Sequence, residues 1–347
     1  MMDDTGKVVF KTFSFPNTSD GGNALFSKLA SYSLNPSDFE IGMEATGHYW
    51  LSVYSFLFEK SFLLHVINPI QTDGWRRGTE IRKRKNDIID SVLIADLIRY
   101  VQFVETRLAD EDLFSLRTLT RFRTYLVESI SDLKRKVVCV LDQVFPEYQS
   151  VFSDIFGKTS KEILLQFSSP IDFEPVSSET LAELLAQLSR QKVGAAKAEQ
   201  LKAAASSSFG VTFAKNSFTF QLKALIEQIS FIEKQVKETE VEISGIMGKL
   251  ESPITTITGI GSVTGAAILS EVGDISKFDS PRKLVLRKAI FQSALIASFK
   301  DPVLSVYYQK KRAEGKHHLT CVGAVARKMC NIIYAVLKSN QPYVPKA

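Results

Sequence analysis

The stretch from Arg82 to Leu97 constrains the fold of this chain more than any other part of the sequence. Two acids, Asp87 and Asp90, precede an apolar run with helical spacing. Acids three residues apart share one face of a helix, so we expect both carboxylates at its first turn. They would form half of a site for a divalent cation. The stretch opens with four consecutive cations that could hold a phosphate backbone beside that metal, namely Arg82, Lys83, Arg84 and Lys85.

A plainer interpretation of the same stretch competes with the metal site. Acids at the first turn of a helix are favoured by the helix dipole, whatever else they do. A run of four cations is commonly a solvated surface segment. The stretch alone leaves both interpretations open.

Length and charge favour a globular protein of more than one domain. A chain of 347 residues with 45% hydrophobic and 23% charged residues is of ordinary globular composition. The net charge of +5 is modest, so nucleic-acid binding must be argued from local clusters. Three widely spaced cysteines and four histidines give no zinc spacing. We expect a cytoplasmic protein with no membrane partner, because we see no secretory signal and no apolar run near membrane-spanning length.

The first hundred residues alternate between strand and helix patterns. This alternation predicts an α/β sheet with parallel neighbours. Glu44 would then lie at the carboxyl end of its strand, where such sheets collect functional residues. The expected elements are a turn at 3–6, strands at 7–13, 39–44 and 62–67, and helices at 19–32 and 47–59.

After residue 109 the pattern becomes helical. A long helix is expected at 113–144, ending before Pro146. The cations of this helix could contact nucleic acid or form a solvated face, and the sequence favours neither interpretation. Residues 150–215 read as an irregular insert with short helices and little chemistry. The cations of the long helix are Arg117, Arg121, Arg123, Lys134, Arg135 and Lys136.

Residues 217–250 carry an apolar seam with steps of three and four. This spacing predicts a coiled coil of about four heptads, with one position skipped at Thr239. Its partner is a second helix, either in the same chain or in a second copy, and a dimer is the expected result. The seam residues are Leu222, Leu225, Ile229, Ile232, Val236, Ile243, Ile246 and Leu250.

Two features near the end of the chain suit nucleic acid. Gly259 and Gly261 open a small-residue helix, as in helix–hairpin–helix modules whose backbone amides approach a phosphate. A tight turn between helices is the plainer explanation, and a dinucleotide fingerprint fails on spacing and context. Cations interleave with aromatic rings farther on. They are Lys310, Lys311 and Arg312, beside Tyr307 and Tyr308.

Taken together, these stretches resemble the transposases of the insertion sequence 110 family, which includes Piv-type site-specific DNA invertases. The resemblance covers nearly the whole chain and rests on the pieces at 42–47, 66–69, 85–90, 258–278 and 307–343. It implies three regions. They are a RuvC-like, ribonuclease-H-like α/β domain at 1–108, a helical region at 109–250 with the coiled coil at 217–250, and a mostly α-helical C-terminal transposase domain at 251–347.

The resemblance also implies chemistry and partners. The family binds Mg²⁺ through the set Asp, Glu, Asp, Asp, and Glu44, Asp87 and Asp90 match the last three as catalytic and metal-binding residues. A serine of the C-terminal domain is the expected nucleophile. The implied partners are DNA, a structured non-coding RNA, and further copies of the chain, as a dimer or tetramer formed through the coiled coil.

Two departures from the family pattern lead to the functional expectation. The chain starts after the family's first Asp, and Val285 runs directly into Leu286 and Arg287, where the family has its serine loop. Ser280 and Ser293 lie in other contexts and are no substitutes. The sequence therefore predicts an insertion-sequence transposase or site-specific recombinase that is catalytically defective. The alternatives are a non-catalytic DNA- or RNA-binding protein that pairs or competes with an intact transposase and, least favoured, a metal-dependent nuclease.

Overall fold

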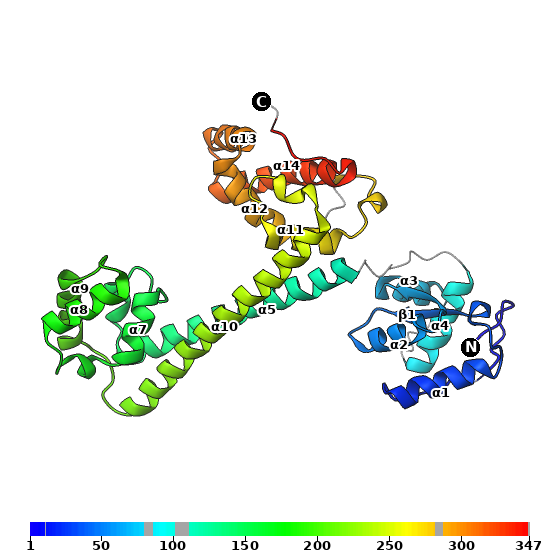
Figure 1. Ribbon diagram of the computed structural model, residues 1–347, viewed down its shortest axis with the longest axis horizontal. Coiled ribbons are helices and arrows are strands. Elements are labelled where there is room, and N and C mark those ends of the chain that lie inside the picture. Colours follow the sequence, from blue (N-terminus) through cyan, green and yellow to red (C-terminus); the bar gives the residue numbers. More distant parts are fainter. Residues whose placement is uncertain (11, 80–85, 101–110, 282–286, 346–347) are drawn as a thin grey trace. The chain divides into compact units, whose positions relative to one another are not determined.

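The computed structural model describes residues 1–10, 12–79, 86–100, 111–281 and 287–345 (Figure 1). The chain forms two compact units, Met1–Ala109 and Asp110–Ala347. The predicted boundary after residue 108 falls in the segment 101–110, outside the described residues, and stays a prediction. Helices dominate both units.

The first unit is built on two parallel strands, β1 (Glu40–Glu44) and β2 (Leu63–Ile67). Helix α2 (Tyr49–Phe58) connects them, and Glu44 pairs in register with Ile67 at the end of the ladder. The parallel α/β pairing predicted from the sequence is thereby confirmed. Within the described residues the sheet has these two strands, so the larger ribonuclease-H-like sheet remains a prediction.

The N-terminal segment only partly follows the prediction. The turn at 3–6 is present, with Gly6 N donating to Asp3 O. The predicted strand at 7–13 is wrong, because the described part of it contributes a single antiparallel bridge between Met2 and Val8. Helix α1 (Ser19–Ala30) is capped by Thr18, whose hydroxyl accepts from Gly21 N.

Helix α4 (Asp87–Arg99) lies directly on strand β1 because Gly42 leaves room for it. A Cβ at Gly42 would come within 2.1 Å of Ile98 and 2.9 Å of Ile94. Asn86 caps the helix by accepting a hydrogen bond from Ile89 N at 2.8 Å. Helix α3 (Pro69–Thr79) packs against α4, with Trp75 beside the buried core of this corner. The helix predicted to begin at Asp87 and pack on the sheet is thus confirmed.

Two long helices, α5 (Glu111–Val144) and α10 (Lys215–Leu250), organise the second unit and lie side by side in Figure 1. They run in opposite directions, since Leu116 near the start of α5 shares a core with Met247 near the end of α10. The predicted seam is therefore a helix pair within one chain. Thr239 is buried in it, with its hydroxyl donating to Gln235 O, so the seam continues through the position expected to be skipped.

Residues 150–215 form a packed helical lobe, the middle lobe, and not the irregular insert that the sequence suggested. Its helices share a buried core with one end of the long pair, where Ile229 and Val140 lie. Tyr148 is fully buried, and its hydroxyl bonds to Ser160. The elements are α6 (Tyr148–Val151), α7 (Lys158–Gln166), η2 (Pro170–Phe173), α8 (Ser178–Ser189) and α9 (Ala195–Ser206).

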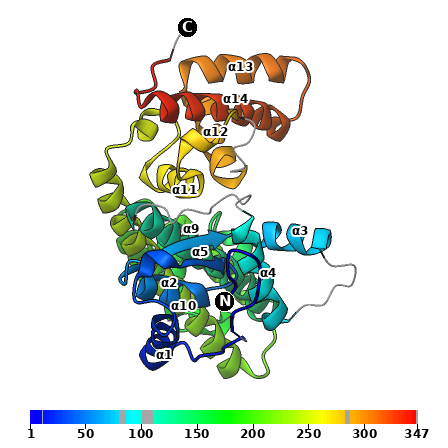
Figure 2. The same ribbon diagram turned by 90° about the vertical axis from the view of Figure 1, so that its right-hand side faces the viewer.

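The C-terminal lobe packs against the other end of the long pair. In Figure 2, α13 lies beside α14, with α12 and α11 beneath them. The elements of this lobe are η3 (Pro253–Thr256), α11 (Ser262–Val272), η4 (Ile275–Lys277), α12 (Arg287–Lys300), α13 (Pro302–Ala313) and α14 (His318–Ser339). The first unit also contains a short turn, η1 (Pro36–Asp38).

Helix α14 is long and apolar enough to cross a membrane, by length and composition alone. This corrects the expectation that no apolar run reaches that length. Its apolar stripe is used inside the protein, because Cys321, Val325, Met329 and Ile333 are all buried in the core of the C-terminal lobe. Packing thus accounts for the hydrophobic character of the helix.

Candidate functional site

The two predicted acids of α4 lie in different surroundings. Asp87 is the first residue of the helix and is exposed. Asp90 lies in line with Ile94 and Ile98, at intervals of four residues, on the face of α4 that packs on β1. Only 17% of its side chain is exposed. The shared first turn predicted for the two acids is confirmed, but only one of them faces the protein.

Asp90 is held by an arginine of the neighbouring helix. Arg76 Nη2 lies 2.7 Å from Asp90 Oδ1, and 10% of the arginine side chain is exposed. A charge-assisted hydrogen bond withdrawn from water is stronger than a surface ion pair. Asp90 is therefore a carboxylate whose charge is already balanced by its own chain.

Glu44 occupies the predicted place at the carboxyl end of β1, where its Oε1 accepts from the hydroxyl of Thr46 at 2.8 Å. Among the described residues, no three His, Cys, Asp or Glu side chains gather closely enough to hold a metal ion. Glu44, Asp87 and Asp90 are thus not brought into one cluster. As arranged, with Asp90 on a guanidinium, these residues do not fit a Mg²⁺ ion, which needs several oxygen ligands at close range.

Of the predicted nucleic-acid contacts, Arg82, Lys83, Arg84 and Lys85 lie outside the described residues. The start of α5 is described, and its cations are used within the protein. Arg117 donates to Ser270 O, Arg121 pairs with Glu271, and Arg123 pairs with Glu240. These three arginines fasten α5 to α11 and α10, which favours the structural interpretation of that end of the helix.

The two glycines ahead of α11 differ in role. Gly259 has a φ of +90°, and a Cβ there would lie 2.5 Å from Ser293 O, so it lets this turn touch the backbone of α12. Gly261 is the N-cap of α11, with open space around it and no side chain capping the helix. Packing therefore explains Gly259, whereas Gly261 leaves a helix N-terminus exposed to an approaching anion.

One acid, Glu314, lies at the basic C-terminal end of α13 and neutralises two of the lysines there. Glu314 accepts from Lys311 Nζ at 2.7 Å and from Lys316 Nζ at 2.8 Å. These two ammonium groups lower the pKa of Glu314 to about 2. Lys310 and Arg312 are exposed beside them. The turn from α13 to α14 thus holds one carboxylate among cations that the sequence predicted for phosphate.

The aromatic rings of this region are mostly covered. Tyr308 is buried, and its hydroxyl lies 2.7 Å from His318 Nδ1. The ammonium of Lys328 sits 4.0 Å from the ring centre of Tyr307. The accessible ring of this region is Phe299 of α12, which is 63% exposed and lies 5.2 Å from the ring of Tyr308. Sequence reasoning missed it because Phe299 belongs to the helix before the basic cluster at 310–312.

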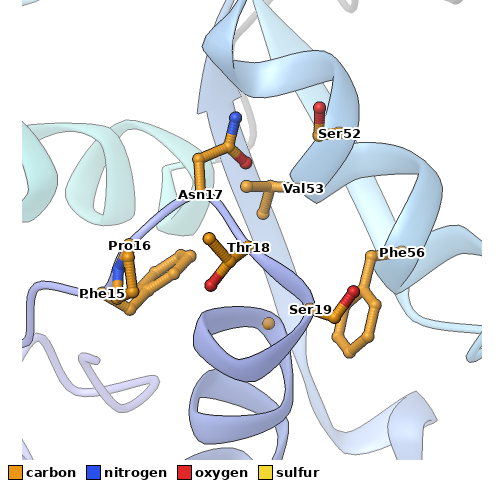
Figure 3. A pocket seen from close by; sticks show the side chains of 9 residues that line it. Phe15, Pro16, Asn17, Thr18, Ser19, Ser52, Val53 and Phe56 are labelled. Carbon is orange, nitrogen blue, oxygen red and sulfur yellow. The ribbon is translucent and has the colours of Figure 1, made fainter.

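A pocket of about 310 Å³ lies between the N-terminal segment and α2, lined by side chains that include Phe15, Thr18 and Phe56 (Figure 3). Its described lining includes neither Glu44 nor Asp90. The pocket is therefore separate from the predicted acids.

Comparison with known proteins gives the family. A transposase family model of the IS110 type matches residues 1–146, and the model described as "Transposase IS116/IS110/IS902 family" matches residues 251–286. The chain is 22% identical to the insertion element IS900 uncharacterized 42 kDa protein of Mycobacterium paratuberculosis, over 80% of this chain and 77% of that protein.

Two further relatives point the same way. The insertion element IS110 uncharacterized 43.6 kDa protein of Streptomyces coelicolor is 21% identical, over 75% of this chain and 72% of that protein. The pilin gene-inverting protein of Moraxella bovis is 28% identical, over 26% of this chain and 38% of that protein. With family models matching residues 1–146 and 251–286 and relatives spanning most of its length, the chain belongs to the IS110 family of transposases.

Proposed function

We propose that this chain is a transposase-family protein that binds DNA and does not carry out strand transfer. Family membership supports a DNA substrate, and the relative named as a pilin gene-inverting protein supports recombination as the ancestral activity. A cytoplasmic location follows from that substrate. The structured RNA implied by the sequence resemblance belongs to the same proposal.

The observation that carries the loss of chemistry is the pairing of Asp90 with Arg76. Strand transfer by this family would need a metal bound through Glu44, Asp87 and Asp90, and these residues are not gathered in the described structure. The sequence adds a second reason, since Val285 is followed at once by Leu286 and Arg287, with no serine loop between them. Without a nucleophile, a covalent step has no acceptor for the cleaved strand.

The binding surface that we propose is the turn from α13 to α14. Lys310, Lys311 and Arg312 follow one another there, and phosphate contacts of this type supply most of the affinity for nucleic acid. The exposed ring of Phe299 on the adjacent helix could stack on an unpaired base.

The alternative, a protein that pairs or competes with an intact transposase, needs a second surface. The predicted seam of α10 is occupied by α5 of the same chain. A dimer or tetramer would therefore use other faces of the long helices, where Phe220, Phe231 and Val241 are exposed. This assembly is a proposal that molecular mass in solution tests.

Fluorescence anisotropy with labelled duplex DNA and with a structured RNA tests the proposed surface. The variant K310Q/K311Q/R312Q should lower the slope of log affinity against log salt by about two to three units, because each lost phosphate contact removes about one. The matched control K158Q/R190Q/K192Q removes the same charge from exposed positions of the middle lobe and should leave the slope unchanged. Equal slopes for both triple variants would refute this surface.

A further inference from the structure

The ring of Tyr307 carries an ammonium group from each of two helices. Lys328 Nζ of α14 lies 4.0 Å from the ring centre, and Lys311 Nζ of α13 lies 5.6 Å from it. An ammonium group within about 6 Å of a ring centre is attracted by the face of the ring. Tyr307 is half-buried and packs against the core of the C-terminal lobe, so its ring is a fixed support at the surface.

A continuous row of contacts joins this ring to the basic turn between α13 and α14. Lys311 Nζ lies 2.7 Å from Glu314 Oε1, and the same carboxylate accepts from Lys316 Nζ at 2.8 Å. The ring-linked row thus consists of Lys316, Glu314, Lys311, Tyr307 and Lys328. Three cations and one acid give it a net positive charge.

The lysines of the ring-linked row differ in what they can offer a ligand. Lys311 and Lys316 share the carboxylate of Glu314. Lys328 is exposed, and in the part of the chain that the structure describes its ammonium group pairs with no carboxylate. Contact with a ring face leaves the N–H donors on the far side of the ammonium group available. Lys328 is therefore the cation of the row best able to donate to a phosphate.

We propose that Tyr307 is a positioning residue that holds Lys328 ready for a phosphate, so that the nucleic-acid surface extends from the turn onto α14. This inference rests on the proposed function and adds Lys328 to its surface. A lysine loses rotamer freedom when it binds, and a lysine already held on a ring has less to lose. The ligand is the phosphodiester backbone, which DNA and RNA share.

A plainer explanation of the same contact is that the stem of Lys328 merely covers an apolar ring. Any apolar side chain would fill that packing role, whereas support of an ammonium group needs an aromatic face. The two explanations therefore differ in what they predict for Tyr307→Leu and Tyr307→Phe.

Fluorescence anisotropy of the full chain with labelled duplex DNA and with a structured RNA tests the extension onto α14. Lys328→Gln should lower the slope of log affinity against log salt by about one unit. Tyr307→Leu should weaken binding about two- to fivefold, Tyr307→Phe should not, and Tyr307→Leu should have no further effect once Lys328→Gln is present. A loss with only one of the two nucleic acids supports the proposal and assigns the contact to that partner.

Lys338→Gln is the matched control. It removes another lysine of α14 that lies over a tyrosine, with Nζ 5.3 Å from the ring centre of Tyr334. Lys338 is ten residues beyond Lys328, about 15 Å farther along the helix, so its loss should leave the slope unchanged.

Proton NMR tests the support itself without nucleic acid. The ring current of Tyr307 should move the ε-methylene protons of Lys328 upfield. This shift should disappear in Tyr307→Leu and persist in Tyr307→Phe. Absence of the shift in the unmodified chain would refute the positioning role.

The inference and the proposed function fail in different ways. If the unmodified chain binds but Lys328→Gln leaves the slope unchanged, the extension onto α14 is refuted and the surface at the turn stands. Equal weakening by Tyr307→Leu and Tyr307→Phe would refute the support by the ring. An unmodified chain that binds neither nucleic acid refutes both. If Tyr307→Leu does not fold, the slope of Lys328→Gln and the proton shift in Tyr307→Phe decide the outcome.

Discussion

At the scale of single residues, two carboxylates are each held by cations of their own chain. Asp90 is paired with Arg76, and Glu314 is shared by Lys311 and Lys316. The sequence predicts which groups could bind metal or phosphate, because Asp and Lys have fixed chemistry and spacing. It does not predict their partners, since Arg76 and Asp90 lie on different helices and meet only through the packing of α3 on α4.

Glu314→Gln should strengthen nucleic-acid binding. The substitution removes the carboxylate that occupies two of the lysines, so a phosphate no longer competes with it. Because the group is exposed and screened by solvent, the expected gain in affinity is about two- to fivefold. Glu238→Gln, which removes the same charge from α10, should have no effect. Equal affinity of the two variants in anisotropy titrations would show that Glu314 does not restrain this surface.

The same ion pairs should be visible as a pH dependence. Lys311 and Lys316 lower the pKa of Glu314 to about 2, below its usual value of 4.5. The pairing therefore stabilises the folded turn above pH 4.5, and this contribution is lost as the pH falls through about 2. Carboxyl carbon NMR should give a midpoint for Glu314 near 2. A midpoint at the usual value would mean that the lysines do not hold it in solution.

Substitution by alanine should destabilise the protein more at Gly259 than at Gly261. Gly259→Ala places a Cβ against Ser293 O at a positive φ, which should cost about 2 kcal/mol or more in urea unfolding. Gly261→Ala meets open space and should cost about 1 kcal/mol or less, the usual loss at an N-cap. If the backbone at Gly261 contacts a phosphate, Gly261→Ala should weaken DNA binding. Its loss of stability should nevertheless be smaller than that of Gly259→Ala. Equal stability losses would contradict the packing role of Gly259.

At the scale of elements, local signals were sufficient where one element dictates its own pattern. The strands β1 and β2, the start of α4 and the apolar seam of α10 all follow from alternation, capping and heptad spacing. The sequence does not reveal the order of residues 150–215, because their helices are short and pack on a core shared with distant residues of α5 and α10. The seam was expected to skip Thr239, yet this residue is buried there and its hydroxyl donates to Gln235 O of the same helix.

Because the seam of α10 is buried and its outer face is exposed, aspartate substitutions on the two faces should differ in how much they destabilise the protein. Ile229 is fully buried in the core of the middle lobe, so Ile229→Asp should destabilise the protein by about 3–5 kcal/mol, the usual cost of an unpaired buried charge. Val241 is 70% exposed, and Val241→Asp should change stability by about 0.5 kcal/mol or less. Urea unfolding gives both values. If Ile229→Asp instead leaves stability intact and only halves the mass seen by light scattering, the seam joins two copies and not α5 to α10.

At the scale of the whole molecule, the comparisons give the family, and the proposed loss of chemistry depends on how the acids of the first unit are arranged. The chain matches IS110-type transposases over residues 1–146 and 251–286. Yet Asp90 is neutralised by Arg76, and no three ligand-type side chains gather among the described residues. The resemblance identifies Glu44, Asp87 and Asp90 as candidate ligands, but the pairing of Asp90 with Arg76 depends on a tertiary contact that no spacing reveals.

The claim that this chain binds DNA without cleaving or joining it is tested most directly by incubating the full chain with labelled duplex DNA at low salt, with and without Mg²⁺ or Mn²⁺. Binding is read on a native gel, and cleavage or strand transfer on a denaturing gel. We expect a bound complex that weakens steeply with salt and gives no cleaved or joined strand under any metal condition. Metal-dependent cleavage that disappears in Asp87→Ala would contradict it and support a nuclease. Absence of binding at low salt would contradict the proposed function as a whole.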